Sequence, residues 1–99
     1  MLELRNLQGQ ALLSLSEGEI RNIEDRTIAT TSGTSLVNLS GQTLAEVENG
    51  GVFRPEGDVL LRVEDSYVVN ASGQRLATVG DGTLDDQALL AAAFLIFLQ

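Results

Sequence analysis

Apolar and polar positions recur along the chain with a period of sixteen residues. Five ungapped units start at residues 4, 20, 36, 52 and 68, and they read LRNLQGQALLSL, IRNIEDRTIATT, LVNLSGQTLAEV, VFRPEGDVLLRV and VVNASGQRLATV. The first position of every unit is aliphatic and holds Leu4, Ile20, Leu36, Val52 and Val68. The ninth position is also aliphatic and holds Leu12, Ile28, Leu44, Leu60 and Leu76. Such strict recurrence indicates a structural repeat.

Each unit has the pattern of a β-hairpin. Its third position is Asn except in the fourth unit, which has Arg54, and its sixth is Gly except in the second, which has Asp25. This pattern favours a type I turn followed by a left-handed residue, a conformation that Asp also tolerates. Further turn signals separate the units, and Asn49-Gly50 and Asp81-Gly82 are typical type I′ dipeptides. We therefore predict a meander of ten short strands over residues 2–80.

Two registers are compatible with this pattern. With a two-residue loop, the first position of each unit pairs with the tenth, which holds Leu13, Ala29, Ala45, Leu61 and Ala77. With a four-residue turn and a bulge, the first position faces the ninth instead. A slip of one residue exchanges the two faces of a strand. The pattern leaves both registers open.

The final segment, TLDDQALLAAAFLIFLQ, breaks the repeat and predicts a helix over residues 83–99. Thr83 is a suitable N-cap, and Asp85 and Asp86 lie in the first turn, where the helix dipole favours anions. The rest is apolar on every face, which is typical of a membrane span or of a helix buried on all sides. A span needs about twenty apolar residues, and residues 88–98 are fewer. We expect the helix to supply the core of a ring of strands, either by threading it or by packing across its mouth.

The predicted fold is mainly β, in a single domain over residues 1–99. Five hairpin repeats (1–82) form a closed ten-strand barrel, and the C-terminal helix (83–99) is its core or plug. An eight-strand barrel is about the widest that its own side chains can fill. A helix about 10 Å across suits the space left inside ten strands.

Hairpin units such as VVNASGQRLATV, followed by a hydrophobic C-terminal helix, resemble the small bacterial β-flower repeat proteins. More distantly, they resemble the tubby and phospholipid scramblase fold, in which a closed barrel encloses a hydrophobic C-terminal helix. Five-fold repetition fits the β-flower type better than the twelve strands of tubby. Tubby-like proteins bind phosphoinositides through basic residues, and this activity is not carried over to a chain without Lys. The resemblance implies a fold and no specific activity.

Composition excludes several classes of function. Fourteen acidic residues against six Arg give a net charge of −8, so nucleic acid and anionic membrane surfaces should be repelled. Without Cys or His, the chain lacks the commonest nucleophiles, general bases and metal ligands. We expect no enzyme activity and no cofactor. The N-terminus MLELRNLQGQ has no secretory signal pattern, which favours a cytoplasmic location.

Three polar patterns could carry chemistry, and each has a simpler interpretation. Acidic residues at the unit junctions could collect a divalent cation, but they lack EF-hand spacing and are interpreted as solvated loop charges. These residues are Glu17, Glu48, Glu64, Asp65 and Asp81. The Asn column could line a ligand mouth, although such residues usually cap their own turns. The pairs Glu24-Asp25 and Asp85-Asp86 could act as acid and base, but a turn and a helix start explain them.

Units three to five are apolar at several positions where the first two units carry Arg or Thr. These positions predict either an interaction patch for a partner or a locally thicker core. The candidate patch comprises Val37, Phe53, Val59, Leu61, Tyr67 and Val69. We expect a structural or protein-interaction module that self-associates as a homo-oligomer. The alternative is a module that binds a small molecule or lipid at the barrel mouth beside the helix, and a membrane tether through the tail is a weaker third hypothesis.

Overall fold

The computed structural model describes residues 1–99 as a closed antiparallel barrel of ten strands around one helix. Each strand pairs with its neighbours in sequence, and β1 pairs with β10 to close the ring. The strands are β1 (Leu2–Arg5), β2 (Ala11–Ser16), β3 (Glu19–Asn22), β4 (Thr27–Ser32), β5 (Ser35–Val37), β6 (Thr43–Glu48), β7 (Gly51–Phe53), β8 (Val59–Glu64), β9 (Tyr67–Asn70) and β10 (Arg75–Val79). The helix is α1 (Leu84–Leu98). The predicted fold class is confirmed.

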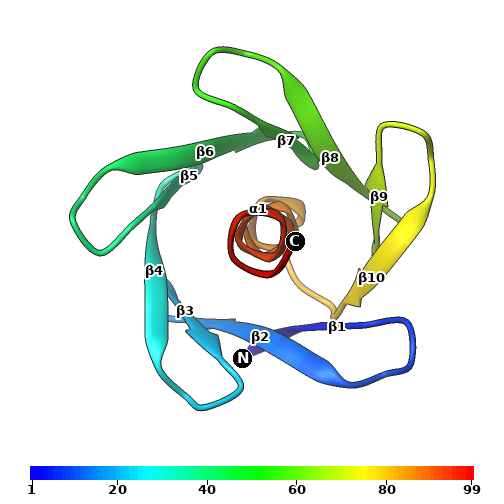
Figure 1. Cartoon of the computed structure of the whole chain (residues 1–99), viewed down its shortest axis with the longest axis horizontal. Helices are drawn as coiled ribbons and strands as arrows, with labels where there is room; N and C mark the ends of the chain where they lie inside the picture. Colours follow the sequence, from blue (N-terminus) through cyan, green and yellow to red (C-terminus); the bar gives the residue numbers. More distant parts are fainter.

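The hairpin of each repeat projects from the ring like a petal (Figure 1). We number the petals one to five along the chain, so that β1 and β2 form petal one and β9 and β10 form petal five. Their tips are residues 6–10, 22–26, 38–42, 54–58 and 70–74. The molecule is a disc of 32 × 31 × 23 Å, and α1 stands at its centre along the short axis (Figure 1).

The turns have the backbone that the repeat predicts, with one exception. The sixth position of every unit is left-handed, including Asp25 at a φ of 63°. Asn49 and Gly50 also have positive φ values, of 51° and 82°, as a type I′ turn requires. The prediction for Asp81-Gly82 is wrong, because this dipeptide has no positive φ and leads from β10 into α1. No eleventh strand follows this dipeptide, so there is no hairpin for it to close.

The register combines features of the two alternatives. The first position of each unit pairs with the tenth, as in Leu4 with Leu13 and Ile20 with Ala29. The pairing then shifts by one residue, because Arg5 pairs with Ala11 and leaves Leu12 in a β-bulge. The same shift occurs in all five petals. A bulge bends its strand and re-aims a side chain, so the ninth-position residues pack against the core as well.

Helix α1 threads the ring instead of packing across its mouth. Thr83 is the N-cap, and its hydroxyl accepts a hydrogen bond of 3.1 Å from the backbone N–H of Asp86. A helix of fifteen residues is about 22 Å long, which matches the 23 Å thickness of the disc. The protein has no helix with the length and apolarity needed to cross a membrane.

The core lies between the inner wall of the ring and the middle of α1. The first-position residues Leu4, Ile20, Leu36, Val52 and Val68 are fully buried. Opposite them, α1 presents small residues with no exposed surface, namely Ala88, Ala91, Ala92 and Ala93, together with the buried Leu89 and Leu90. Small side chains bring the helix close to the strands on every side. The diameter of the ring is thus matched to an alanine-rich helix.

This close fit makes the interior intolerant of added volume. Replacing Ala92 by Leu should lower the free energy of unfolding by about 1–3 kcal/mol, because extra methyl groups in a filled core force strain on their neighbours. The matched control is Ala71→Leu, since Ala71 lies exposed in the tip of petal five. Urea denaturation followed by circular dichroism measures both. An unchanged midpoint for Ala92→Leu would show that the ring is wider than described.

Candidate functional site

The two flat ends of the disc differ, because the first turn of α1 lies at one end and its last turn at the other (Figure 1). The first turn of α1 lies near the turns that join successive petals, where Leu84 is close to Gly50. The last turn of α1 lies near the petal tips, where Leu95 and Ile96 line a groove with Pro55. We call these ends the junction face and the tip face. The tip face is formed by the petal tips, the ninth-position residues and the last turn of α1.

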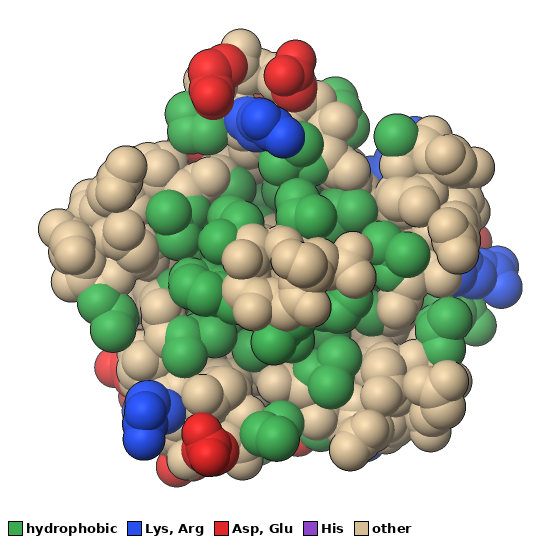
Figure 2. Space-filling view, in the orientation of Figure 1, with side chains coloured by type: hydrophobic (Ala, Val, Ile, Leu, Met, Phe, Trp, Pro, Cys, Tyr) green, Lys and Arg blue, Asp and Glu red, His purple; other side chains and the backbone are tan.

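The tip face is apolar over much of its area. Figure 2 shows hydrophobic side chains gathered around the C-terminal end of α1 and continuing toward the petals. Three petal tips carry a large aliphatic residue at the fourth position of the unit, and Leu7, Ile23 and Leu39 are 53%, 75% and 67% exposed. The last turn of α1 adds three more exposed side chains, Ile96, Phe97 and Leu98. Turn positions usually favour polar residues, so this recurrence has no explanation in the turn itself.

The Asn column holds the petal tips in shape. In petal three, Oδ1 of Asn38 accepts hydrogen bonds of 2.9 Å from the backbone N–H groups of both Ser40 and Gln42. Asn6, Asn22 and Asn70 make the equivalent pairs of bonds. These side chains are therefore occupied by their own turns. They position the exposed aliphatic residue that follows each of the first three of them.

We expect Asn38→Ala to lower the free energy of unfolding by about 1 kcal/mol, because two backbone donors lose their acceptor. Arg54 is the matched control, since its petal lacks an Asn cap and Arg54→Ala removes no such bond. Thermal or urea denaturation of the two variants measures the difference. Equal losses of stability would contradict the role assigned to the Asn column.

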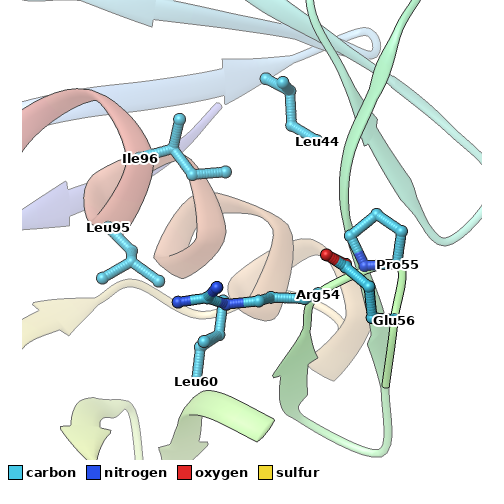
Figure 3. Close-up of a pocket in the computed structure, with 7 residues that line it drawn as sticks. All are labelled: Leu44, Arg54, Pro55, Glu56, Leu60, Leu95 and Ile96. Carbon is cyan, nitrogen blue, oxygen red and sulfur yellow. The ribbon is translucent and has the colours of Figure 1, made fainter. Parts of the chain in front are cut away.

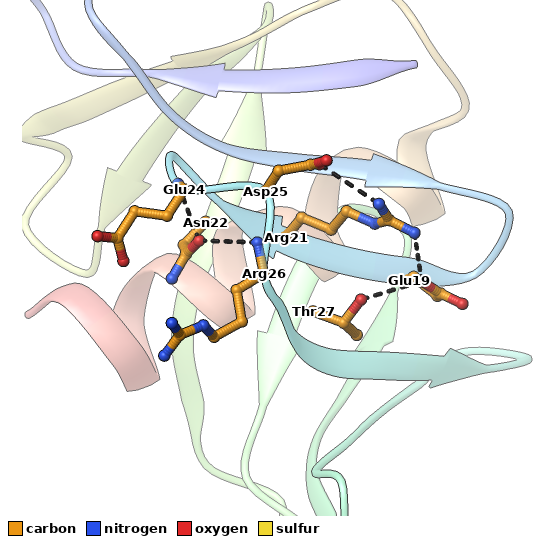
Figure 4. A network of polar contacts seen from close by, with 7 residues as sticks. All are labelled: Glu19, Arg21, Asn22, Glu24, Asp25, Arg26 and Thr27. Carbon is orange, nitrogen blue, oxygen red and sulfur yellow. Dashed lines mark hydrogen bonds and ion pairs between the residues drawn. The ribbon is translucent and has the colours of Figure 1, made fainter.

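Several charged residues on the outer wall form ion pairs. In petal two, Arg21 contacts Glu19 at 2.8 Å and Asp25 at 3.3 Å, and the Thr27 hydroxyl donates to Glu19 at 3.0 Å (Figure 4). The hydrogen bond from Arg21, with that from Thr27, lowers the pKa of Glu19 below its usual value. The same carboxylate raises the pKa of Arg21. Both groups are thus held in their charged forms as a salt bridge within β3, and the Thr27 hydroxyl links this pair to β4.

The junction face is acidic. The residues Glu17, Glu48, Asp65 and Asp81 lie at its turns, with Asp85 and Asp86 in the first turn of α1. None of them forms an ion pair, whereas Glu64 pairs with Arg62 on the wall at 2.7 Å. No three acidic side chains come close enough together to hold a metal ion. The face is a region of separated negative charges.

The structure places the candidate patch on the outer wall and separates its members. Leu61 is part of the core at 3% exposure, which corrects its assignment to a surface. Val69 is equally buried, beside Arg62 and Arg75 on the neighbouring strands. The members that retain exposed area are Val37, Phe53, Tyr67 and Val59, of which only Phe53 and Val59 pair directly. The apolar tip face was missed, although aliphatic residues in the turn positions of three units were its signal.

Two features of the tip face are chemically distinctive. One is the set of exposed hydrophobic side chains in three petal tips and in the last turn of α1, which we call the crown. The other is a groove of about 410 Å³ between petals three and four, which contains an arginine (Figure 3). Neither feature contains an arrangement of a nucleophile and a base.

Comparison with known proteins gives one match. A sequence model described as "5-fold beta-flower protein" matches residues 2–98, which is nearly the whole chain. No curated protein and no solved structure matches it.

Proposed function

The chain belongs to the 5-fold beta-flower family, and from this we propose that it is a non-enzymatic interaction module that self-associates through its tip face. The family is not a known enzyme family, and it suggests a small structural or interaction module. The observation that carries the proposal is the exposure of Leu7, Ile23 and Leu39 in three petal tips, together with Ile96, Phe97 and Leu98 in the last turn of α1. A soluble surface with apolar side chains at repeated positions is typical of a surface that a partner covers.

The size of the tip face fits a stable dimer. An ellipse with the two long dimensions of the disc, 32 and 31 Å, covers about 800 Å², which is what each partner contributes to an interface of standard size. In Figure 2 apolar side chains surround the end of α1 at the centre of the face, and interface cores are likewise rich in apolar side chains. Two copies that meet face to face would therefore cover the crown and the end of α1 in a single contact.

The distribution of charge favours this orientation. The unpaired acidic residues of the junction face lie at the other end of a disc 23 Å thick. In a face-to-face dimer they point outward, and at physiological ionic strength charges separated by more than about 8 Å are largely screened. Contact through the junction faces would instead bring two acidic surfaces together.

Polar substitutions at the petal tips test the proposal. The double variant Ile23→Ser and Leu39→Ser should raise the dimer dissociation constant at least about tenfold, because each large aliphatic side chain loses a favourable burial of roughly 1.5–3 kcal/mol. Sedimentation equilibrium over a range of protein concentrations measures the dissociation constant. A wild-type protein that stays monomeric at every concentration would overturn self-association.

The matched control is Val59→Ser on the outer wall, where Val59 is 54% exposed. It removes a similar aliphatic side chain without touching the tip face, so the dissociation constant should not change. If Val59→Ser or Phe53→Ser dissociates the protein and the tip variant does not, the outer wall is the interface and the tip face is not.

A further inference from the structure

The groove between petals three and four departs from the five-fold symmetry of the tip face, because petal four has Arg54 where the other petals have Asn. It holds about 410 Å³ and is lined by Leu44, Leu60, Leu95, Ile96 and Pro55, with Arg54 and Glu56 as its charged residues (Figure 3). Pockets for small ligands typically measure about 300–1,000 Å³ and combine apolar walls with a few polar groups. The groove has both properties.

Arg54 is the residue that the turn does not explain. In the other four petals an Asn occupies this position and caps the tip. In petal four the backbone closes the turn alone, through bonds from Arg54 N–H to the Asp58 carbonyl at 2.9 Å and from Gly57 N–H to the Arg54 carbonyl at 2.8 Å. Pro55 fixes the φ angle that this turn needs. The side chain of Arg54 is therefore free of any role in the turn.

The guanidinium of Arg54 has no protein partner. Four of the six arginines are engaged, since Arg5, Arg21 and Arg62 pair with carboxylates and Arg75 lies 4.0 Å from the ring centroid of Tyr67. Arg54 makes neither kind of contact, and Glu56 is not within ion-pair distance of it. Figure 3 shows its side chain reaching past Leu60 toward Leu95, while Glu56 lies beside Pro55 at the petal.

We infer that this groove binds a carboxylate carried on an aliphatic chain. A guanidinium presents a planar fork of donors that matches a carboxylate with two parallel hydrogen bonds. The leucine and isoleucine side chains beside it would cover the aliphatic chain. The groove between petals one and two offers the contrast, because it holds about 270 Å³ and is lined by Met1 and by the carboxylates of Glu3 and Asp25, which already pair with Arg5 and Arg21. An anionic amphiphile therefore fits the first groove and not the second.

The proposal is tested by titrating the protein with sodium decanoate while following the methyl resonances of Leu44, Leu60 and Ile96 by NMR. We expect saturable shifts at these methyl groups and none at Val59. Arg54→Gln should weaken binding at least about tenfold, because a charge-assisted pair is lost. Glu56→Gln should strengthen binding, because a like charge at the rim is removed. Decyltrimethylammonium, which has the same chain and the opposite charge, should bind more weakly than decanoate.

Three outcomes would overturn the inference. The first is equal binding of decanoate by wild type and Arg54→Gln, and the second is equal binding of the two amphiphiles. The third is a lower urea midpoint for Arg54→Gln with unchanged decanoate affinity, which would make Arg54 a partner of the helix dipole at the end of α1. Sedimentation of the protein without decanoate keeps this test separate from self-association, because a protein that is monomeric without decanoate and still binds it would support the groove while refuting the dimer.

Discussion

The ring and the helix each bury surface that the other leaves open. Ten strands enclose more space than their own side chains fill, since eight strands are already near that limit. Helix α1 is apolar around its whole circumference and would lose the favourable burial of every large side chain if it were exposed. Its four buried alanines let it stand close to all sides of the wall at once. Closure of the sheet, the inward orientation of the first-position residues and the thickness of the disc all depend on this mutual burial.

The β-bulge is the second constraint, and it links the core to the surface. By leaving the ninth residue of each unit unpaired, it lets both Leu12 and Leu13 contribute to the interior of petal one. It also bends the strand, so the hairpins turn away from the ring as petals (Figure 1). The tips then surround the end of α1 and present their turn residues on one face. The β-bulge that helps to pack the core thus also shapes the petals that carry the surface of the proposed function.

The two ends of α1 lie at opposite faces of the disc, and these faces carry different kinds of side chain (Figure 1). The junction face carries six acidic residues that form no ion pair, two of them in the first turn of α1. The tip face collects aliphatic side chains, and its petal tips also carry two arginines, Arg26 and Arg54, and three acidic residues, Glu24, Glu56 and Asp58, that form no ion pair. The unpaired charge is therefore more negative at the junction face than at the tip face, so two copies would repel each other more strongly through their junction faces.

The sequence by itself determined the repeat, the turn positions, the number of strands and the helix, because each depends on local rules. Asn and Gly set the turns, an aliphatic alternation sets the inner wall, and Thr83 with an unbroken apolar run sets α1. Tertiary structure decided the rest. The register depends on a bulge that no single residue encodes, and the burial of Leu61 depends on which face that register turns inward, whereas Val69 is buried on the outer wall between its neighbouring strands. The same holds for the tip face, since the petal tips and the last turn of α1 are far apart in the chain and come to one face only because the ring closes around the helix (Figure 1).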